Sequence, residues 1–326
     1  MAAAACSSPK SRIYSEAEIG KTSTITIRSE SGQRTVQVME GASLHTGVTA
    51  DVAAFAKKQI PLPVPMDLEV FELAKKELVS FAQTNFDKGL LEKLTANILP
   101  ITFPMLVAQL KNCIVQFNQK IGKTSYEAAY VVPETSREWV TQLALKYGIT
   151  PPRVLHAGRP DPNNSSETVA ILDECSFSGS NITGCIRDLT QIFGRISQDH
   201  KLVLESLPSV KPTIRNIYVL MPFISSTAKK SLNAWSDFLK ENGNINMTVI
   251  TGSISIPSAD SLLDEEEFER FEELYDPDTG AYALAFSEWK TPDDVSIPTQ
   301  LLEGGYNGKF TSIPFHSRDV FVPYHS

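Results

Sequence analysis

Cysteine is scarce in this 326-residue chain, and its scarcity excludes small cross-linked folds. The four cysteines, Cys6, Cys113, Cys175 and Cys185, are too few and too scattered for a disulfide framework. None of them forms a Cys-x-x-Cys pair, so a structural zinc site has no support in the sequence. We therefore expect reduced thiols and a cytoplasmic protein.

Long apolar runs and an excess of basic residues are also missing. No stretch of about 18 apolar residues occurs, so we expect no membrane-spanning segment. The formal net charge of −8 argues against a basic surface for duplex nucleic acid, although it allows a local basic pocket. With 42% hydrophobic and 21% charged residues, the composition is that of a globular protein with a sizeable core.

The chain divides into three regions by pattern. Residues 1–60 hold a polar tail and a predicted β-hairpin, because apolar residues alternate on either side of a turn at Gly32. Residues 61–122 are predicted to be helical, with helices that begin after Asp67, near residue 90 and near Phe103. We expect the second of these helices to cover about residues 90–99 and the third about residues 103–119. Residues 123–326 form the third region.

Strand and helix patterns alternate in the third region. Short apolar segments predict strands at residues 127–132, 153–156, 168–172, 214–221, 247–251 and 281–286. Between several of these segments, apolar residues recur at helical spacing, as in the stripe Ile182, Ile186, Leu189 and Phe193. This alternation predicts an α/β fold with a mainly parallel sheet and helices on both faces.

One strand end carries an unusual combination of residues. Four apolar residues, 169–172, lead into Asp173 and Glu174, and a small hydroxyl-rich loop follows before the next helix. A loop that feeds a helix N-terminus offers free N–H groups to a phosphate, and Gly179 would let the backbone approach it closely. Carboxylates suit sugar hydroxyls or a magnesium ion. The order of acids and loop therefore predicts a ribose 5-phosphate site, and a plain helix-capping loop is the alternative.

This segment resembles the phosphoribosyl diphosphate (PRPP) loop of type I phosphoribosyltransferases. Asp173, Glu174, Ser178 and Gly179 match the family pattern of two acids, three variable residues and Ser/Thr-Gly, whereas Asn181 stands where the family usually has Thr or Ser. The resemblance implies that the ligand contacts come from Cys175, Ser176, Phe177, Ser178, Gly179, Ser180 and Asn181. It also implies catalytic and Mg²⁺-binding roles for Asp173 and Glu174.

Three further segments occupy places where the family has ligand contacts. Ser136 and Arg137 follow the first predicted strand and suit a diphosphate, although glycines are missing there and a plain helix cap explains them equally. Arg159 lies in a polar loop that suits a catalytic lid or a solvated turn. Lys290 and Asp293 follow the last predicted strand, in a stretch similar to phosphoribosyltransferase-like domains of bacterial conflict and defence systems. This resemblance would put them near the base or acceptor, and a surface turn is the alternative.

Two functions fit these observations. In the first, the protein binds PRPP or a ribose 5-phosphate nucleotide and transfers or cleaves at the anomeric carbon, with Mg²⁺ as cofactor. In the second, a nucleotide-binding sensor uses the same fold without catalysis, since fold does not fix function. A methyltransferase is a third and less favoured possibility, because the Gly-rich loop that such enzymes have after an early strand is missing from the sequence. Neither function requires duplex nucleic acid or a membrane, and a homo-oligomer is compatible with both.

Overall fold

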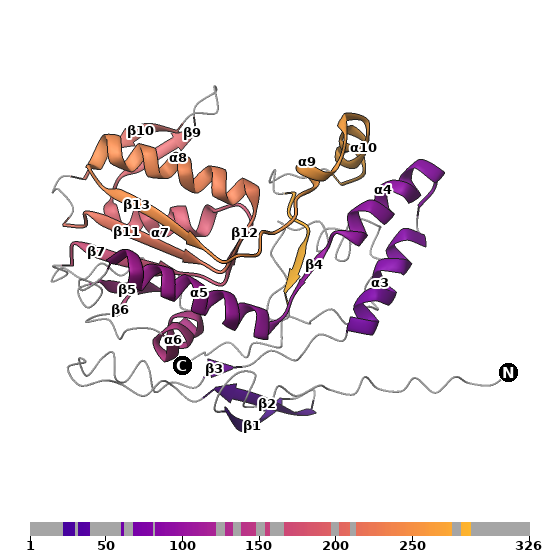
Figure 1. Cartoon of the computed structure of the whole chain (residues 1–326), viewed down its shortest axis with the longest axis horizontal. Helices are drawn as coiled ribbons and strands as arrows, with labels where there is room; N and C mark the ends of the chain where they lie inside the picture. The colour runs from indigo at the N-terminus through magenta and orange to yellow at the C-terminus, as the bar shows by residue number, and fades with distance from the viewer. Residues whose placement is uncertain are drawn as a thin grey trace.

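The structure of the chain is a computed structural model that describes residues 22–29, 32–39, 60–61, 68–80, 82–121, 128–132, 138–147, 154–156, 166–196, 202–208, 213–275 and 282–287. Its centre is a five-stranded sheet in the order β13-β11-β7-β5-β6 (Figure 1). The strands are β5 (Ala129–Val132), β6 (Val154–His156), β7 (Thr168–Leu172), β11 (Asn216–Met221) and β13 (Asn246–Thr251). All neighbouring strands in this sheet run parallel.

The alternation of side chains along β7 explains why the sheet is covered on both faces. Val169 and Ile171 pack with helices α7 (Ser180–Thr190) and α8 (Ser226–Gly243). Ala170 and Leu172 point to the opposite face and pack with helices α5 (Phe103–Ile121) and α6 (Glu138–Tyr147). A strand that is apolar on both faces needs a helical layer on each side, and Figure 1 shows this three-layer arrangement. The predicted α/β fold is confirmed.

A second group of elements lies beside the sheet and joins two distant parts of the chain (Figure 1). It contains α3 (Leu68–Ser80), α4 (Asn85–Ala96), β4 (Leu99–Ile101), α9 (Ala259–Leu262), α10 (Glu265–Tyr275) and β14 (Ala285–Ser287). β14 pairs with β4 in parallel, and Arg270 of α10 binds the buried carboxylate of Asp87 on α4 at 2.8 Å and 3.3 Å. Lys93 and Glu267 form a second ion pair between the same two helices.

Antiparallel hairpins account for most of the remaining described strands. β1 (Thr22–Ser29) pairs with β2 (Gly32–Met39), which confirms the predicted hairpin, and β2 also pairs with β3 (Ile60–Pro61). A further hairpin, β9 (Phe193–Ile196) with β10 (Leu202–Ser206), was not predicted. The division of the chain at residues 60 and 122 stays a prediction, although α5 packs on the main sheet.

Two predicted helices have different ends in the structure. The helix expected at residues 90–99 is α4, which begins earlier because Thr84 caps it by accepting the Asp87 N–H at 3.0 Å. It ends at Ala96, and the Leu99 N–H instead donates to the Leu284 carbonyl. Phe193 is not on α7, since Gln191 adopts a left-handed conformation with φ of 55° and ends that helix.

Candidate functional site

The segment between β7 and α7 extends the strand before the chain turns into the helix. Asp173 and Glu174 interrupt the pairing after β7, and β8 (Cys175–Ser176) resumes it beside β12 (Phe223–Ile224). The Asp173 N–H donates to the Leu220 carbonyl at 3.3 Å, which holds the interruption against β11. This whole segment lies at the carboxyl end of the central strand of the sheet.

The sheet order gives this position its chemical significance. Numbered by their order along the chain, the five strands run 2-1-3-4-5 across the sheet, so the order reverses between β5 and β7. In open parallel sheets, the crevice beyond the strand ends at such a reversal is where ligands bind. Residues 173–181 follow β7, one of the two strands that flank the reversal.

Both predicted carboxylate residues are buried at the base of this segment. Asp173 is 1% exposed and Glu174 is 2% exposed. One Asp173 carboxylate oxygen, Oδ1, accepts the Glu174 N–H at 2.9 Å, and both residues have further interactions. In this arrangement the carboxylates lie beneath the protein surface and do not present themselves to a sugar in solvent.

The hydroxyl-rich turn at residues 178–181 is more accessible than the acids. Ser178 is half-buried, and Ser180 and Asn181 are exposed. The Ser178 and Ser180 hydroxyls share a hydrogen bond of 2.8 Å, and the Ser180 N–H donates to the Ser178 hydroxyl at 3.3 Å. Since the N-cap residue of α7 is a glycine, no N-cap side chain satisfies the next N–H groups of the helix, those of Asn181 and Ile182. The turn therefore offers hydroxyl and amide donors at a positive helix end.

Gly179 is explained by the backbone conformation of the turn. Its φ of 85° is one that residues with a side chain rarely adopt. A Cβ at this position would make ordinary contacts with α8, at 3.4 Å from the Ser231 Cβ and 3.5 Å from the Ala228 carbonyl oxygen. The expected close approach of Gly179 to a phosphate stays a prediction.

Ser225, which was not predicted from the sequence, links residues 176–177 to the start of α8 by hydrogen bonds. Its hydroxyl accepts the Ala228 N–H at 3.0 Å and donates to the Phe177 carbonyl, while its own N–H donates to the Ser176 carbonyl at 3.0 Å. The signal was present, because a serine directly before a helical stripe is a typical N-cap. Ser225 thus helps to set the backbone of residues 176–177.

Gln109, also missed, holds the loop after β13 at the same edge of the sheet. Its buried side-chain carbonyl accepts the Ser253 N–H at 2.7 Å and the Ser253 hydroxyl at 3.1 Å. A Cβ on Gly252 would lie 2.3 Å from the Pro222 carbonyl oxygen, so only glycine fits this close approach. No local pattern around Gln109 predicts the contact, because its partner is 144 residues away.

The other predicted site residues lie outside the described residues. These are Ser136, Arg137, Arg159, Lys290 and Asp293. The described strands end shortly before each of them, at Val132, His156 and Ser287. Their contacts with a ligand therefore stay predictions.

The described residues contain neither a cluster of metal-ligating side chains nor a membrane-spanning helix. Within the described ranges, His, Cys, Asp and Glu side chains form no group of three or more that could hold a metal ion. Over the same ranges, no helix has the length and apolar character needed to cross a bilayer.

No protein-family model matches the chain, and no curated protein matches its sequence. Among solved structures, a Helicobacter pylori xanthine-guanine-hypoxanthine phosphoribosyltransferase is similar with 12% sequence identity and a TM-score of 0.27, over 48% of this chain and 88% of that one.

Proposed function

We propose that the protein binds the phosphate of a ribose 5-phosphate compound, either PRPP or a nucleotide, at residues 178–181. The observation that carries this proposal is the position of the turn: it opens α7 at the carboxyl end of β7, beside the reversal of the sheet order. The first N–H groups of α7 and its dipole favour an anion there. Ser180 and Asn181 are exposed, so a phosphate can reach them.

The resemblance supplies the remaining roles in the enzymatic form of the proposal. Arg137 and Arg159 bind the diphosphate, and Lys290 and Asp293 lie near the base. The acceptor attacks the anomeric carbon and pyrophosphate leaves, so the work of the protein is positioning, charge complementarity and exclusion of water.

As described, Asp173 and Glu174 do not fit a hydrated magnesium ion. Mg²⁺ keeps several of its waters when a protein binds it, whereas these residues are only 1% and 2% exposed. Magnesium therefore enters the proposal only as a counter-ion of the diphosphate.

The burial of the two acids favours a second candidate, the non-catalytic nucleotide sensor. A transferase has to present carboxylates to the ribose hydroxyls, while a sensor that reads the phosphate needs only the turn at residues 178–181. Asn181 also favours the sensor, because it stands where the phosphoribosyltransferases that the loop resembles usually have Thr or Ser.

Isothermal titration with ribose 5-phosphate, nucleoside monophosphates and PRPP, each with and without Mg²⁺, tests the proposal and separates the two candidates. We expect ribose 5-phosphate to bind. PRPP binding that Mg²⁺ strengthens, with release of pyrophosphate, supports the transferase. Monophosphate binding that Mg²⁺ does not change supports the sensor.

The variant Ser180→Asp tests the location of the site. Asp is favoured in the first turn of a helix, so the fold should tolerate it, but its charge should repel a phosphate. We expect it to weaken ribose 5-phosphate binding by at least about tenfold, whereas the control Asn233→Asp, exposed on α8, leaves binding unchanged. Wild-type affinity in Ser180→Asp contradicts the proposed site.

A further inference from the structure

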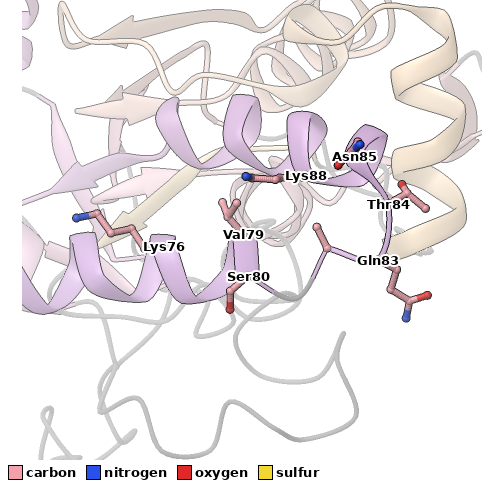
Figure 2. A pocket seen from close by; sticks show the side chains of 8 residues that line it. Lys76, Val79, Ser80, Gln83, Thr84, Asn85 and Lys88 are labelled. Atoms are coloured by element: carbon pink, nitrogen blue, oxygen red, sulfur yellow. The ribbon is translucent and has the colours of Figure 1, made fainter.

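A basic groove lies between α3 and α4, away from the site described above. It encloses about 620 Å³, and none of the described residues that line it is acidic. Lys76 from α3 and Lys88 from α4 border it, and Figure 2 shows Val79 beneath Lys88 in the gap between the helices. The Lys88 ammonium lies 3.9 Å from the Glu92 carboxylate, but both groups are exposed. An exposed ion pair of this kind is weak, so the Lys88 ammonium can still interact with a carboxylate of another molecule.

An apolar side chain is exposed beside Lys76. Leu73, one turn before Lys76 on α3, is 64% exposed. An exposed apolar group with polar neighbours is typical of surfaces that bind another protein. The groove therefore has the features of a docking surface.

The chain also carries a surface of opposite charge, the acidic face of α10. It consists of exposed glutamates, Glu265, Glu266, Glu269, Glu272 and Glu273, and the opposite side of the helix buries Phe271 completely. Arg270 pairs with Glu273 at 2.9 Å, and the Tyr282 hydroxyl donates to Glu272 at 3.0 Å. The remaining glutamates of this face turn their charge to solvent.

Two ion pairs fix the acidic face relative to the groove. Asp87 and Lys93 of α4 bind Arg270 and Glu267 of α10. Successive residues are about 100° apart around a helix, so Lys88 and Lys93 lie on different sides of α4. The ion pairs join α10 to a side of α4 other than the one that lines the groove, so one copy does not fill its own groove with its own acidic face.

We propose that the acidic face of α10 in one copy of the chain docks in the basic groove between α3 and α4 of a second copy. The two surfaces are complementary in charge and differ from each other, so the contact is head-to-tail. Such a contact leaves one groove and one acidic face unused in every pair, and further copies can add. The association depends on exposed charges and therefore weakens as salt is raised.

Sedimentation velocity of the full chain over a range of concentrations tests the proposal. We expect concentration-dependent association at about 0.1 M salt that is lost at about 1 M, where the screening length is about 3 Å. The groove variant carries Lys76→Glu and Lys88→Glu, and the face variant carries Glu265→Lys and Glu269→Lys. Each variant alone should associate at least about tenfold more weakly than the wild type at low salt.

Mixing the two variants is the decisive measurement. The groove variant keeps a working acidic face and the face variant keeps a working groove, so an equimolar mixture should form a complex of two chains and nothing larger. The control Lys229→Glu with Lys240→Glu makes the same charge change at exposed positions of α8 and should associate like the wild type. If charge reversal unfolds the groove variant, Lys76→Gln with Lys88→Gln replaces it.

Three results overturn the proposal: a wild type that stays monomeric at every concentration, a face variant that still associates alone, or a mixture that stays monomeric. A face variant that associates alone would mean that the groove binds something other than the acidic face.

Discussion

At the scale of single residues, one hydroxyl joins two loops at the edge of the sheet where we propose the ligand binds. Ser225 caps α8 and donates to the Phe177 carbonyl. We expect Ser225→Ala to lower the free energy of unfolding by about 1–2 kcal/mol, because it removes a cap and leaves a buried carbonyl without its donor. Urea denaturation followed by circular dichroism measures the change.

The neighbouring serine is the matched control for this substitution. The buried hydroxyl of Ser226 has no hydrogen-bond partner within the described part of the chain. Ser226→Ala should therefore leave the stability unchanged or raise it slightly. Equal losses in the two variants would contradict the role given to Ser225.

Replacement by alanine should change the free energy of unfolding in opposite directions at Gly179, the N-cap of α7, and at Gly184, inside that helix. Gly179 has a φ of 85°, a backbone conformation that a residue with a side chain adopts only with strain, so Gly179→Ala should cost about 1–2 kcal/mol. At Gly184, inside the helix, the nearest atom to a new Cβ is 3.8 Å away, so Gly184→Ala should add about 0.5–1 kcal/mol through helix propensity. Chemical denaturation of both variants checks the pair, and a neutral Gly179→Ala would show that the turn relaxes.

At the scale of elements, the sequence predicted well wherever the pattern was local. Alternating or continuous apolar runs located β7, β11 and β13, and helical stripes located α5, α6 and α8. The prediction failed where partners are distant. Leu99 continues an apolar run after α4, but its N–H pairs with Leu284, and nothing near residue 99 indicates that partner. Burial of Asp173, which is 1% exposed, was not predicted either, and its N–H bonds to the carbonyl of Leu220 on a strand 47 residues along the chain.

The contact between α4 and α10 should make stability depend on acid. The hydrogen bonds from Arg270 to the Asp87 carboxylate lower the pKa of that group below its ordinary value of 3.8, although burial opposes the shift. A lowered pKa in the folded state stabilises the protein above the ordinary value, and this contribution is lost as pH falls through the lowered value. The contribution is therefore complete at neutral pH and disappears in acid.

Asp87→Asn tests this dependence. It should lower the melting temperature at pH 7, and its gap to the wild type should close as pH falls below about 4. The control is Glu72→Gln, which breaks the exposed pair with Lys75 on α3 and should change the melting temperature little at any pH. A gap for Asp87→Asn that is constant with pH would show that the loss is one of packing rather than charge.

At the scale of the whole molecule, the proposed site depends on strand order more than on any single motif. The motif at residues 173–181 was readable from the sequence, but the reversal of order between β5 and β7 comes from pairing between strands far apart in the chain. Because of that reversal, the hydroxyl-rich turn at residues 178–181 lies where ligands bind in open parallel sheets. The most rigid part of the molecule should accordingly lie directly beneath the turn.

Hydrogen exchange measured by mass spectrometry tests this distribution of stability. β7 and β11 have strands on both sides and helices on both faces, so their amides should exchange slowest, whereas β10, with residues 204–206 exposed at a hairpin, should exchange much faster. Ribose 5-phosphate should slow exchange at residues 181–182, in the first turn of α7, and leave β10 unchanged, because a bound phosphate would occupy those N–H groups. If exchange slows evenly over the molecule, the ligand stabilises the fold in general. If exchange slows only in α3 and α4, the phosphate binds in the basic groove and not at residues 178–181.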